Sequence, residues 1–179
     1  TLTNAGTKDM FIVKYDPNGN VLWAKSAGGT LDETGTSCAT DASGNIIATG
    51  SFYGSTVTFG PTVLTNAGYA EIFIVKYDPS GNELWAKSAA GGTSYAAGCA
   101  TDGSSNIVAS GSFFSPAITF GTTVLNNIDN SGNTGDIFIV KYDTSGNVVW
   151  AKSAGGMGNS ADSPYGCATD ASGNIITTG

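Results

Sequence analysis

The sequence FIVKYDPNGNVLWAKSA, residues 11–27, returns twice in this chain with few changes. The second copy, FIVKYDPSGNELWAKSA, spans residues 73–89, and the third, FIVKYDTSGNVVWAKSA, spans residues 138–154. Each copy has two β-branched and aromatic runs, which fit the pleated surface of a strand. Between the runs of the first copy lie Asp16, Pro17 and Gly19, residue types that favour tight turns through local bonds, a fixed φ and a positive φ. The stretch therefore predicts a β-hairpin, repeated three times.

A second pair of strands follows each of these hairpins or precedes it. GTSCATD at residues 35–41 leads through a short turn into NIIATGSF at residues 45–52, and residues 98–113 and 166–179 match this pair. A smaller hairpin is expected inside the connection that follows, at residues 57–65 and again at residues 118–125. No segment keeps a helical period over three turns, so no helix is expected.

Four antiparallel strands in a unit that repeats at this spacing are typical of a β-propeller blade. A β-solenoid is the alternative, but its repeats are shorter and its strands parallel. We therefore predict an all-β propeller segment over residues 1–179, with four-stranded antiparallel blades and about three blades per chain. Small side chains in the first two strands of the unit place these strands near the propeller axis. The expected units are two strands of a split blade at 9–29, full blades at 35–90 and 96–155, and the other two strands of a split blade at 163–179.

The repeated motifs resemble the SBBP family of bacterial β-propeller repeats. The resemblance lies in CATD at residues 38–41 with Gly44 and Asn45, in TGSF at residues 49–52, and in FIVKYD at residues 11–16. It covers nearly the whole chain and is specific for a fold, not for a reaction. It implies an extracellular or cell-surface protein, in a family whose members mostly have no defined activity.

The chain is expected to hold about three blades, one of them split into the strand pairs at 9–29 and 163–179. Propellers usually close with four to eight blades, so we expect chains to assemble. The strand pair at 163–179 of one chain is expected to join the strand pair at 9–29 of another. Two chains then form a six-bladed homodimeric ring, or many chains form a filament if the rotation does not close. The alternative is a fragment of a longer protein that supplies the missing blades itself.

The composition of the chain argues against several classes of site and partner. Histidine is absent, which excludes Ser-His-Asp and Cys-His catalysis and zinc sites that need imidazole. The net charge of −7 disfavours nucleic acid and anionic membranes as partners. No apolar run is long enough to span a membrane. Charged residues make up only 12%, and polarity carried by uncharged side chains favours an extracellular location.

Residues at the same position in every copy are interpreted as structural. Trp23, Trp85 and Trp150 are expected to pack between blades rather than to stack on sugars. Cys38, Cys99 and Cys167 are expected to be small side chains near the axis rather than a metal site or a nucleophile, and no disulfide is expected between them. Lys14 and Lys25 are interpreted as solvated residues of a blade edge.

The turns around Asp16 and Asp41 could hold calcium, but they lack the glycine and glutamate of an EF-hand loop. We expect each aspartate to bond its own backbone instead. Calcium at Asp32 and Glu33, or at residues 129–133, stays an open alternative.

Residues that differ between copies are better binding candidates, because variable loops on a rigid scaffold commonly carry function. These are residues 31–33, Ser94, residues 128–134 and residues 157–164, together with three aromatic residues, Tyr53, Tyr95 and Phe114.

The sequence predicts a non-enzymatic scaffold for structure or protein interaction that needs no cofactor. The alternative is a lectin-like propeller that binds glycans through Tyr53, Tyr95 and Phe114. A hydrolase or lyase ranks last, because it needs an acid/base cluster at the axis.

Overall fold

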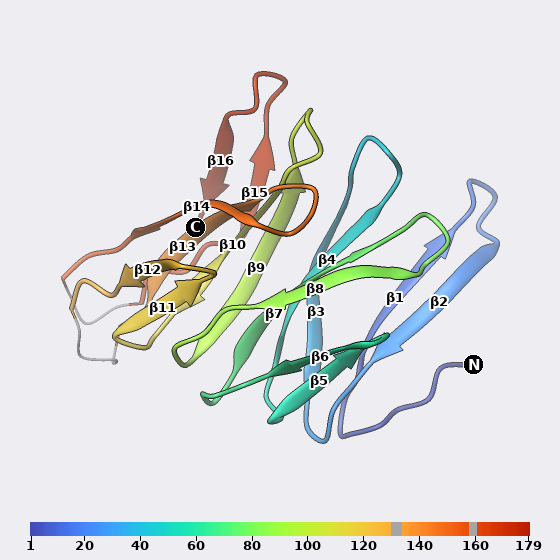
Figure 1. Cartoon of the computed structure of the whole chain (residues 1–179), viewed down its shortest axis with the longest axis horizontal. Helices are drawn as coiled ribbons and strands as arrows, with labels where there is room; N and C mark the ends of the chain where they lie inside the picture. Colours follow the sequence, from blue (N-terminus) through green and yellow to red (C-terminus); the bar gives the residue numbers. More distant parts are fainter. Residues whose placement is uncertain (130–133, 158–160) are drawn as a thin grey trace.

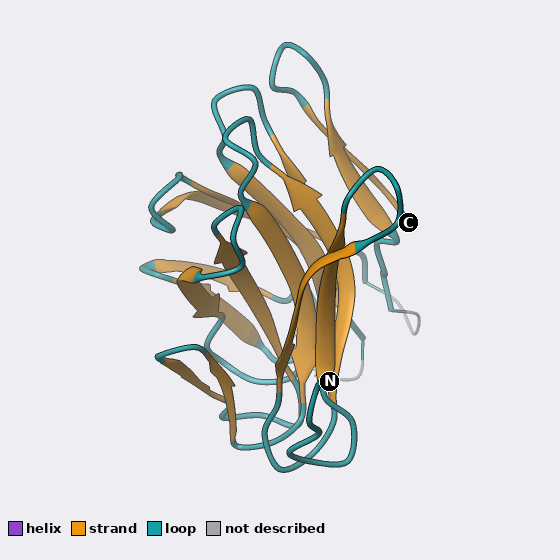
Figure 2. Cartoon of the chain, turned by 90° about the vertical axis from the view of Figure 1, so that its right-hand side faces the viewer, coloured by secondary structure: helices purple, strands orange, loops and turns teal. Residues whose placement is uncertain are grey.

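The computed structural model describes residues 1–129, 134–157 and 161–179, and every regular element in these ranges is a β-strand (Figure 2). The prediction of an all-β fold is confirmed. No helix in this described part is long and apolar enough to cross a membrane.

Two four-stranded antiparallel sheets form the centre of the molecule (Figure 1). Their strands are, in spatial order, β3 (Glu33–Thr40), β4 (Ile46–Phe52), β7 (Glu71–Tyr77) and β8 (Glu83–Ser88) in one sheet, and β9 (Ser94–Thr101), β10 (Ile107–Phe113), β13 (Asp136–Tyr142) and β14 (Val148–Ala154) in the other. Each sheet is one four-stranded propeller blade, as the repeat predicts.

Two-stranded sheets flank the blades at opposite ends of the row (Figure 1). The first hairpin pairs β1 (Met10–Tyr15) with β2 (Val21–Ala27), and the last pairs β15 (Gly166–Thr169) with β16 (Ile175–Thr178). We call these the β1–β2 and β15–β16 half-blades. Among the described residues, these two half-blades do not pair with each other.

Each blade also carries the small hairpin that the sequence predicts within its connection. It consists of β5 (Thr56–Phe59) with β6 (Thr62–Thr65) in one blade and of β11 (Ala117–Phe120) with β12 (Thr123–Asn126) in the other. Phe59 stacks at a tilt on Phe73 of β7, and Phe120 stacks in the same way on Phe138 of β13. The small hairpin thus packs on its own blade and also reaches the end of the preceding sheet, where Gly29 lies under the Thr56 carbonyl and Gly91 lies under the Ala117 carbonyl.

One turn chemistry shapes six hairpins. In the first, Asp16 Oδ1 accepts hydrogen bonds from the backbone amides of Asn18 and Asn20, each at 2.8 Å. Asp16 Oδ2 accepts a third, from Asn20 Nδ2 at 2.8 Å, and Gly19 has a φ of 83°. The same three bonds recur at five further aspartates, Asp41, Asp78, Asp102, Asp143 and Asp170. The prediction that the aspartate bonds its own turn is confirmed.

The first strands of successive units lie against one another. β3 contacts β9, and β9 contacts β15. The Thr101 hydroxyl donates to the Thr40 carbonyl at 2.7 Å, and the Thr169 hydroxyl donates to the Thr101 carbonyl at 2.6 Å. This threonine row links the innermost strands along the axis, where the sequence placed them.

Two apolar clusters fill the spaces between neighbouring sheets. One packs Met10 and Ile12 of β1 against the first full blade, and the other packs Ile72 and Ile74 of β7 against the second. Every residue of β4, β7 and β10 is buried. The core is therefore formed between blades rather than within a single sheet.

The tryptophans join each blade to the next. Trp23 Nε1 donates to the Pro79 carbonyl at 3.0 Å, and Trp85 Nε1 donates to the Thr144 carbonyl at 3.2 Å. Pro79 and Thr144 occupy the same position in the turns of the following blades. These two half-buried indoles thus lie between blades, and each N–H finds its partner in a turn carbonyl of the following blade.

The interpretation of the repeated lysine as a solvated edge residue is wrong for Lys76. This side chain is only 3% exposed, and its Nζ lies 3.0 Å from Asp41 Oδ2 and donates to the Thr144 carbonyl at 3.4 Å. The turn bonds of Asp41 leave Oδ2 facing the third strand, so the lysine there has a buried anion to pair with. Lys25 does lie exposed on β2, as expected.

A candidate ligand-binding groove between the blades

The three aromatic residues that the sequence nominates for binding lie together, in a row with a fourth. Tyr53 directly follows β4, Phe114 takes the equivalent position after β10, and Tyr95 lies in β9. The ring centroids are 6.3 Å apart for Tyr53 and Tyr95, and 5.9 Å apart for Tyr95 and Phe114. Tyr69, which the sequence interpretation missed, packs edge-on against Tyr53 at 5.5 Å and is 71% exposed.

This aromatic row borders a groove of about 570 Å³ between the two full blades. Tyr53 belongs to the row, between Tyr69 and Tyr95, but does not line the groove. The lining consists of Gly68, Tyr69, Gly92, Thr93, Tyr95, Phe114 and Ser115. These residues provide aromatic rings, two aliphatic hydroxyls and backbone, and no charged side chain. Such a surface suits a neutral ligand that has both apolar faces and hydroxyl groups.

The floor of the groove is closely packed. A Cβ at Gly68 would lie 2.7 Å from the Gly92 carbonyl carbon, and a Cβ at Gly92 would lie 2.7 Å from Ser115 Cβ. Phe114 packs over Gly135, and its amide donates to the Thr93 carbonyl at 2.9 Å. The groove is therefore preformed by backbone contacts between blades.

The Tyr95 hydroxyl keeps its proton at neutral pH. Burial raises the pKa of Tyr95 above its usual value, and the neighbouring Tyr53 and Tyr69 raise it further. The Tyr95 hydroxyl can therefore donate and accept hydrogen bonds, while an acid/base step by it is disfavoured.

Two residues proposed to lie in variable loops, Glu33 and Ser94, instead begin strands. Glu33 begins β3 and is buried. Ser94 begins β9 and is fully buried, and its hydroxyl accepts a hydrogen bond from the Ile72 amide at 3.3 Å. Sequence difference between copies at these positions reflects packing between blades. Residues 130–133, within the 128–134 segment and the calcium alternative at 129–133, and residues 158–160, within the 157–164 segment, lie outside the described residues.

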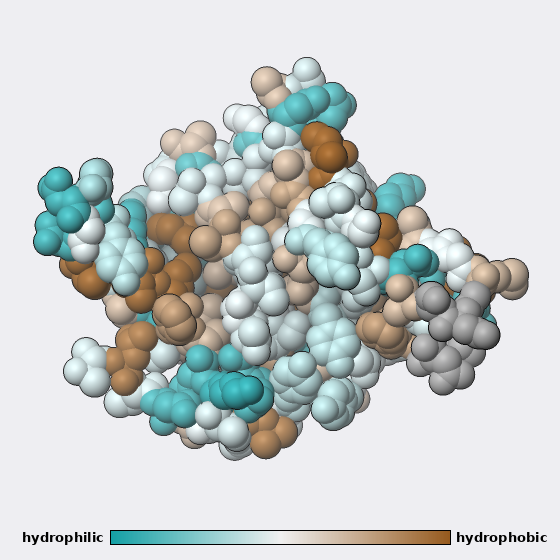
Figure 3. Space-filling model, turned by 180° about the vertical axis from the view of Figure 1, so that it is seen from behind, coloured by the Kyte–Doolittle hydropathy of each residue, from teal (hydrophilic) through white to brown (hydrophobic). Residues whose placement is uncertain are grey.

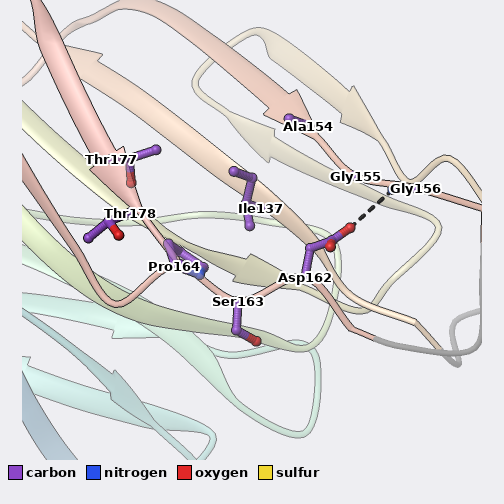
Figure 4. A pocket seen from close by; sticks show the side chains of 10 residues that line it. Ile137, Ala154, Gly155, Gly156, Asp162, Ser163, Pro164, Thr177 and Thr178 are labelled. Carbon is purple, nitrogen blue, oxygen red and sulfur yellow. Dashed lines mark hydrogen bonds between the residues drawn. The ribbon is translucent and has the colours of Figure 1, made fainter.

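A second hollow, of about 490 Å³, lies between β13, the end of β14 and the β15–β16 half-blade (Figure 4). The Gly156 amide donates to Asp162 Oδ2 there at 3.0 Å. Gly91, which precedes Gly156 by one repeat, lies under the Ala117 carbonyl at the start of β11, whereas a Cβ at Gly156 would meet nothing within 4 Å. The hollow therefore corresponds to the place that the small hairpin of a following blade occupies, and we do not assign a ligand to it.

The cysteines lie on the innermost strands β3, β9 and β15 as free thiols. Burial raises the pKa of Cys99 to about 11, and burial also raises the pKa of Cys167. A thiol with a raised pKa is a poor nucleophile and a poor metal ligand. Within the described ranges, no three His, Cys, Asp or Glu side chains come together in a geometry that could hold a metal ion.

Comparison with known proteins supports the propeller architecture. No protein-family model matches the chain. The chain is similar to the uncharacterized WD repeat-containing protein L264 of Acanthamoeba polyphaga mimivirus, with 34% identity over 177 residues that cover 81% of this chain and 12% of that protein. It is also similar to the regulatory protein FlaEY of Caulobacter vibrioides, with 29% identity over 83 residues that cover 45% of this chain and 9% of that protein.

The chain thus spans a small part of the length of these relatives. The similarity to a WD repeat-containing protein, together with four-stranded antiparallel sheets, shows a β-propeller-type repeat segment. The narrower SBBP resemblance remains a prediction, because none of these comparisons concerns that family.

Proposed function

We propose that this propeller segment is a non-enzymatic scaffold for protein interaction, located outside the cell or at its surface, that assembles by sharing blades between chains. The propeller-type repeats support the scaffold role, since rigid blades present variable loops at fixed positions. The low content of charged residues supports the extracellular location.

The observation that carries the proposal is the exposure of core residues on the half-blades. Phe11 of β1 is 69% exposed, whereas its counterparts Phe73 and Phe138 in the full blades are 0% exposed. Tyr15 is 58% exposed, and its counterpart Tyr77 is 4% exposed. Figure 3 shows hydrophobic side chains gathered on the side of the molecule that carries β1 and β2. Such a patch beside an open strand edge marks an interaction surface.

The mass of the protein in solution tests the proposal. We expect light scattering at micromolar concentration to give twice the mass of one chain, or larger assemblies. A folded species that keeps the mass of a single chain at every concentration contradicts blade sharing.

A second candidate function is glycan binding, which the aromatic groove specifically favours. Sugar rings stack their apolar faces on tyrosine and phenylalanine, and the hydroxyls of Thr93 and Ser115 suit their polar edges. A glycan array tests this function, with Tyr69→Ala and Tyr95→Ala expected to abolish any signal. Tyr165→Ala is the matched control, because Tyr165 is 81% exposed and does not line the groove.

A further inference from the structure

The two full blades show how the first hairpin of a unit joins the second. In one blade, β4 pairs with β7 so that Ile46 lies opposite Tyr77 and Gly50 lies opposite Phe73. In the other, β10 pairs with β13 in the same register, with Gly111 opposite Phe138. In both blades the phenylalanine ring lies directly on the glycine, where a Cβ would overlap it.

An ion pair accompanies this register in both blades. Asp41, in the turn between the first two strands, pairs with Lys76 of the third strand at 3.0 Å. Asp102 pairs with Lys141 in the same way at 2.7 Å. Both aspartates and Lys76 are buried. A buried pair of this kind discriminates strongly between partners, because either charge left alone in the interface is costly.

The half-blades hold the separate members of one more such set. Asp170 lies in the turn of the β15–β16 half-blade, exposed, and none of the ion pairs in the described ranges includes it. Lys14 of β1 donates only to the Pro79 carbonyl, at 3.0 Å, and has no carboxylate partner in the same ranges. Gly179 repeats the position of Gly50 and Gly111, with a carbonyl on one side of it and no ring on the other.

We propose that β1 of a second copy of this chain pairs antiparallel with β16, in the register of the full blades. In this joint Ile175 lies opposite Tyr15 of the partner subunit, and Gly179 lies under Phe11 of the partner subunit. Asp170 forms the ion pair with Lys14 of the partner subunit. The proposal rests on the proposed function of blade sharing and specifies the surface that performs it.

The neighbouring blade adds two hydrogen bonds to the same joint. Trp85 and Lys76 both donate to the Thr144 carbonyl of the following blade. Trp150 and Lys141 are their counterparts in the last full blade, and the corresponding carbonyl belongs to Pro17 of the partner subunit. The joint therefore recruits donors from the full blade as well as from the half-blade.

A second copy fits this edge because its complementary residues are present on the same chain. The exposed edge of β16 lacks a third strand that carries lysine, phenylalanine and tyrosine at fixed spacing, and β1 carries these at Lys14, Phe11 and Tyr15. A generic apolar partner would leave Asp170 without its cation.

Charge reversal tests the ion pair without requiring knowledge of any other ligand. We expect Asp170→Lys alone and Lys14→Asp alone to lose assembly, since each variant places like charges in both joints of a homodimer. An equimolar mixture of the two variants should assemble again, because both joints of a mixed dimer contain opposite charges. One joint keeps the original aspartate and lysine, and the other contains the same two charges with their positions exchanged. Light scattering and native mass spectrometry measure the mass and the one-to-one composition.

Matched variants separate charge pairing from damage to the fold. Asp143→Lys removes the same turn bonds as Asp170→Lys at a site without an ion pair, and Lys25→Asp reverses an exposed charge on β2, so both should assemble as the wild type does. Circular dichroism verifies that each variant is folded. Asp170→Asn, which keeps the amide-accepting oxygen of the turn, should weaken association about tenfold or more.

The outcomes distinguish this inference from blade sharing in general. Restored assembly in the mixture, with neither variant assembling alone, supports the joint. If the single variants assemble as well as the wild type does, the specific joint is wrong while blade sharing stands. If the wild type has the mass of a single chain, both proposals are overturned.

Discussion

At the scale of single residues, the blade is built around buried charges that have very different partners. Asp102 has a lysine and a full set of turn bonds, whereas Glu71 is 1% exposed and accepts one long bond, from the Ala67 amide at 3.4 Å. Burial raises the pKa of Glu71 to about 7. For Asp102, burial acts to raise the pKa, but the bonds from Lys141 and Asn106 outweigh it and lower the pKa to about 2. These two carboxyls should therefore affect stability in opposite directions.

Replacing Glu71 with glutamine should stabilise the protein at neutral pH and leave it unchanged in acid. Below about pH 4.5 the carboxyl is protonated in both states, and between 4.5 and about 7 only the unfolded state ionises, so wild-type stability falls as the pH rises. We expect Glu71→Gln to gain about 1–3 kcal/mol at pH 8. Denaturant unfolding across pH 4–8 measures this, and parallel profiles for the two proteins would contradict it.

Replacing Asp102 with asparagine should destabilise the protein at neutral pH, since it leaves Lys141 without its anion. We expect a loss of about 3 kcal/mol in the free energy of unfolding. The depressed pKa contributes stability above pH 3.8 that is lost as the pH falls toward 2, so the variant should lack this part of the acid transition. Asp143→Asn is the control. Asp143 makes the same turn bonds between β13 and β14 but has no lysine partner in the described part of the chain, so this variant should lose less stability.

At the scale of strands and turns, close contact between glycine and an aromatic ring fixes how the second strand meets the third. Gly111 lies under the Phe138 ring in the fully buried strand β10. Gly50 does the same for Phe73. The small residue and the ring together hold the register, because a slip of one residue would reverse the face of every side chain.

We expect Gly111→Ala to destabilise the protein by about 2 kcal/mol or more, since the methyl group overlaps both the Phe138 ring and the Tyr95 carbonyl. Gly103→Ala is the matched control. A Cβ at Gly103 meets nothing within 4 Å, so this variant should unfold at nearly the wild-type temperature. Equal melting temperatures for the two variants would refute the packing argument.

The strands and turns could be predicted from sequence because their signals are local. The aspartate, asparagine and glycine of each turn lie within five residues, and the continuous apolar run at residues 72–75 marks a buried strand. The Asp41–Lys76 pair joins residues far apart in the chain, so the lysine looked like a solvated one. Tyr69 was missed because it lies in the connection between β4 and β7, and only the folding of that connection brings it to Tyr53.

At the scale of the whole molecule, the same side chain has different tasks in different blades. Trp85 stabilises a joint within the chain, through its bond to the Thr144 carbonyl. Trp150 is its counterpart one repeat later, and in the joint proposed above it donates to the partner subunit instead. Equivalent substitutions should therefore separate folding from assembly.

We expect Trp85→Phe to lower the free energy of unfolding by about 1–3 kcal/mol and Trp150→Phe to leave the unfolding of the single chain nearly unchanged. Trp150→Phe should instead weaken association about tenfold. Chemical denaturation and sedimentation velocity provide the two measurements. The same effect of both variants on association would contradict the assignment of Trp150 to the joint.

The threonine row gives the molecule a polarity. Thr101 and Thr169 each donate backward to the preceding blade, while Trp23 and Trp85 each donate forward to the following one. If chains share blades as we propose, they can therefore join in one direction only, with the β15–β16 half-blade of one chain meeting the β1–β2 half-blade of the next. An open assembly of this kind would have two different ends, one presenting a β1–β2 half-blade and the other a β15–β16 half-blade.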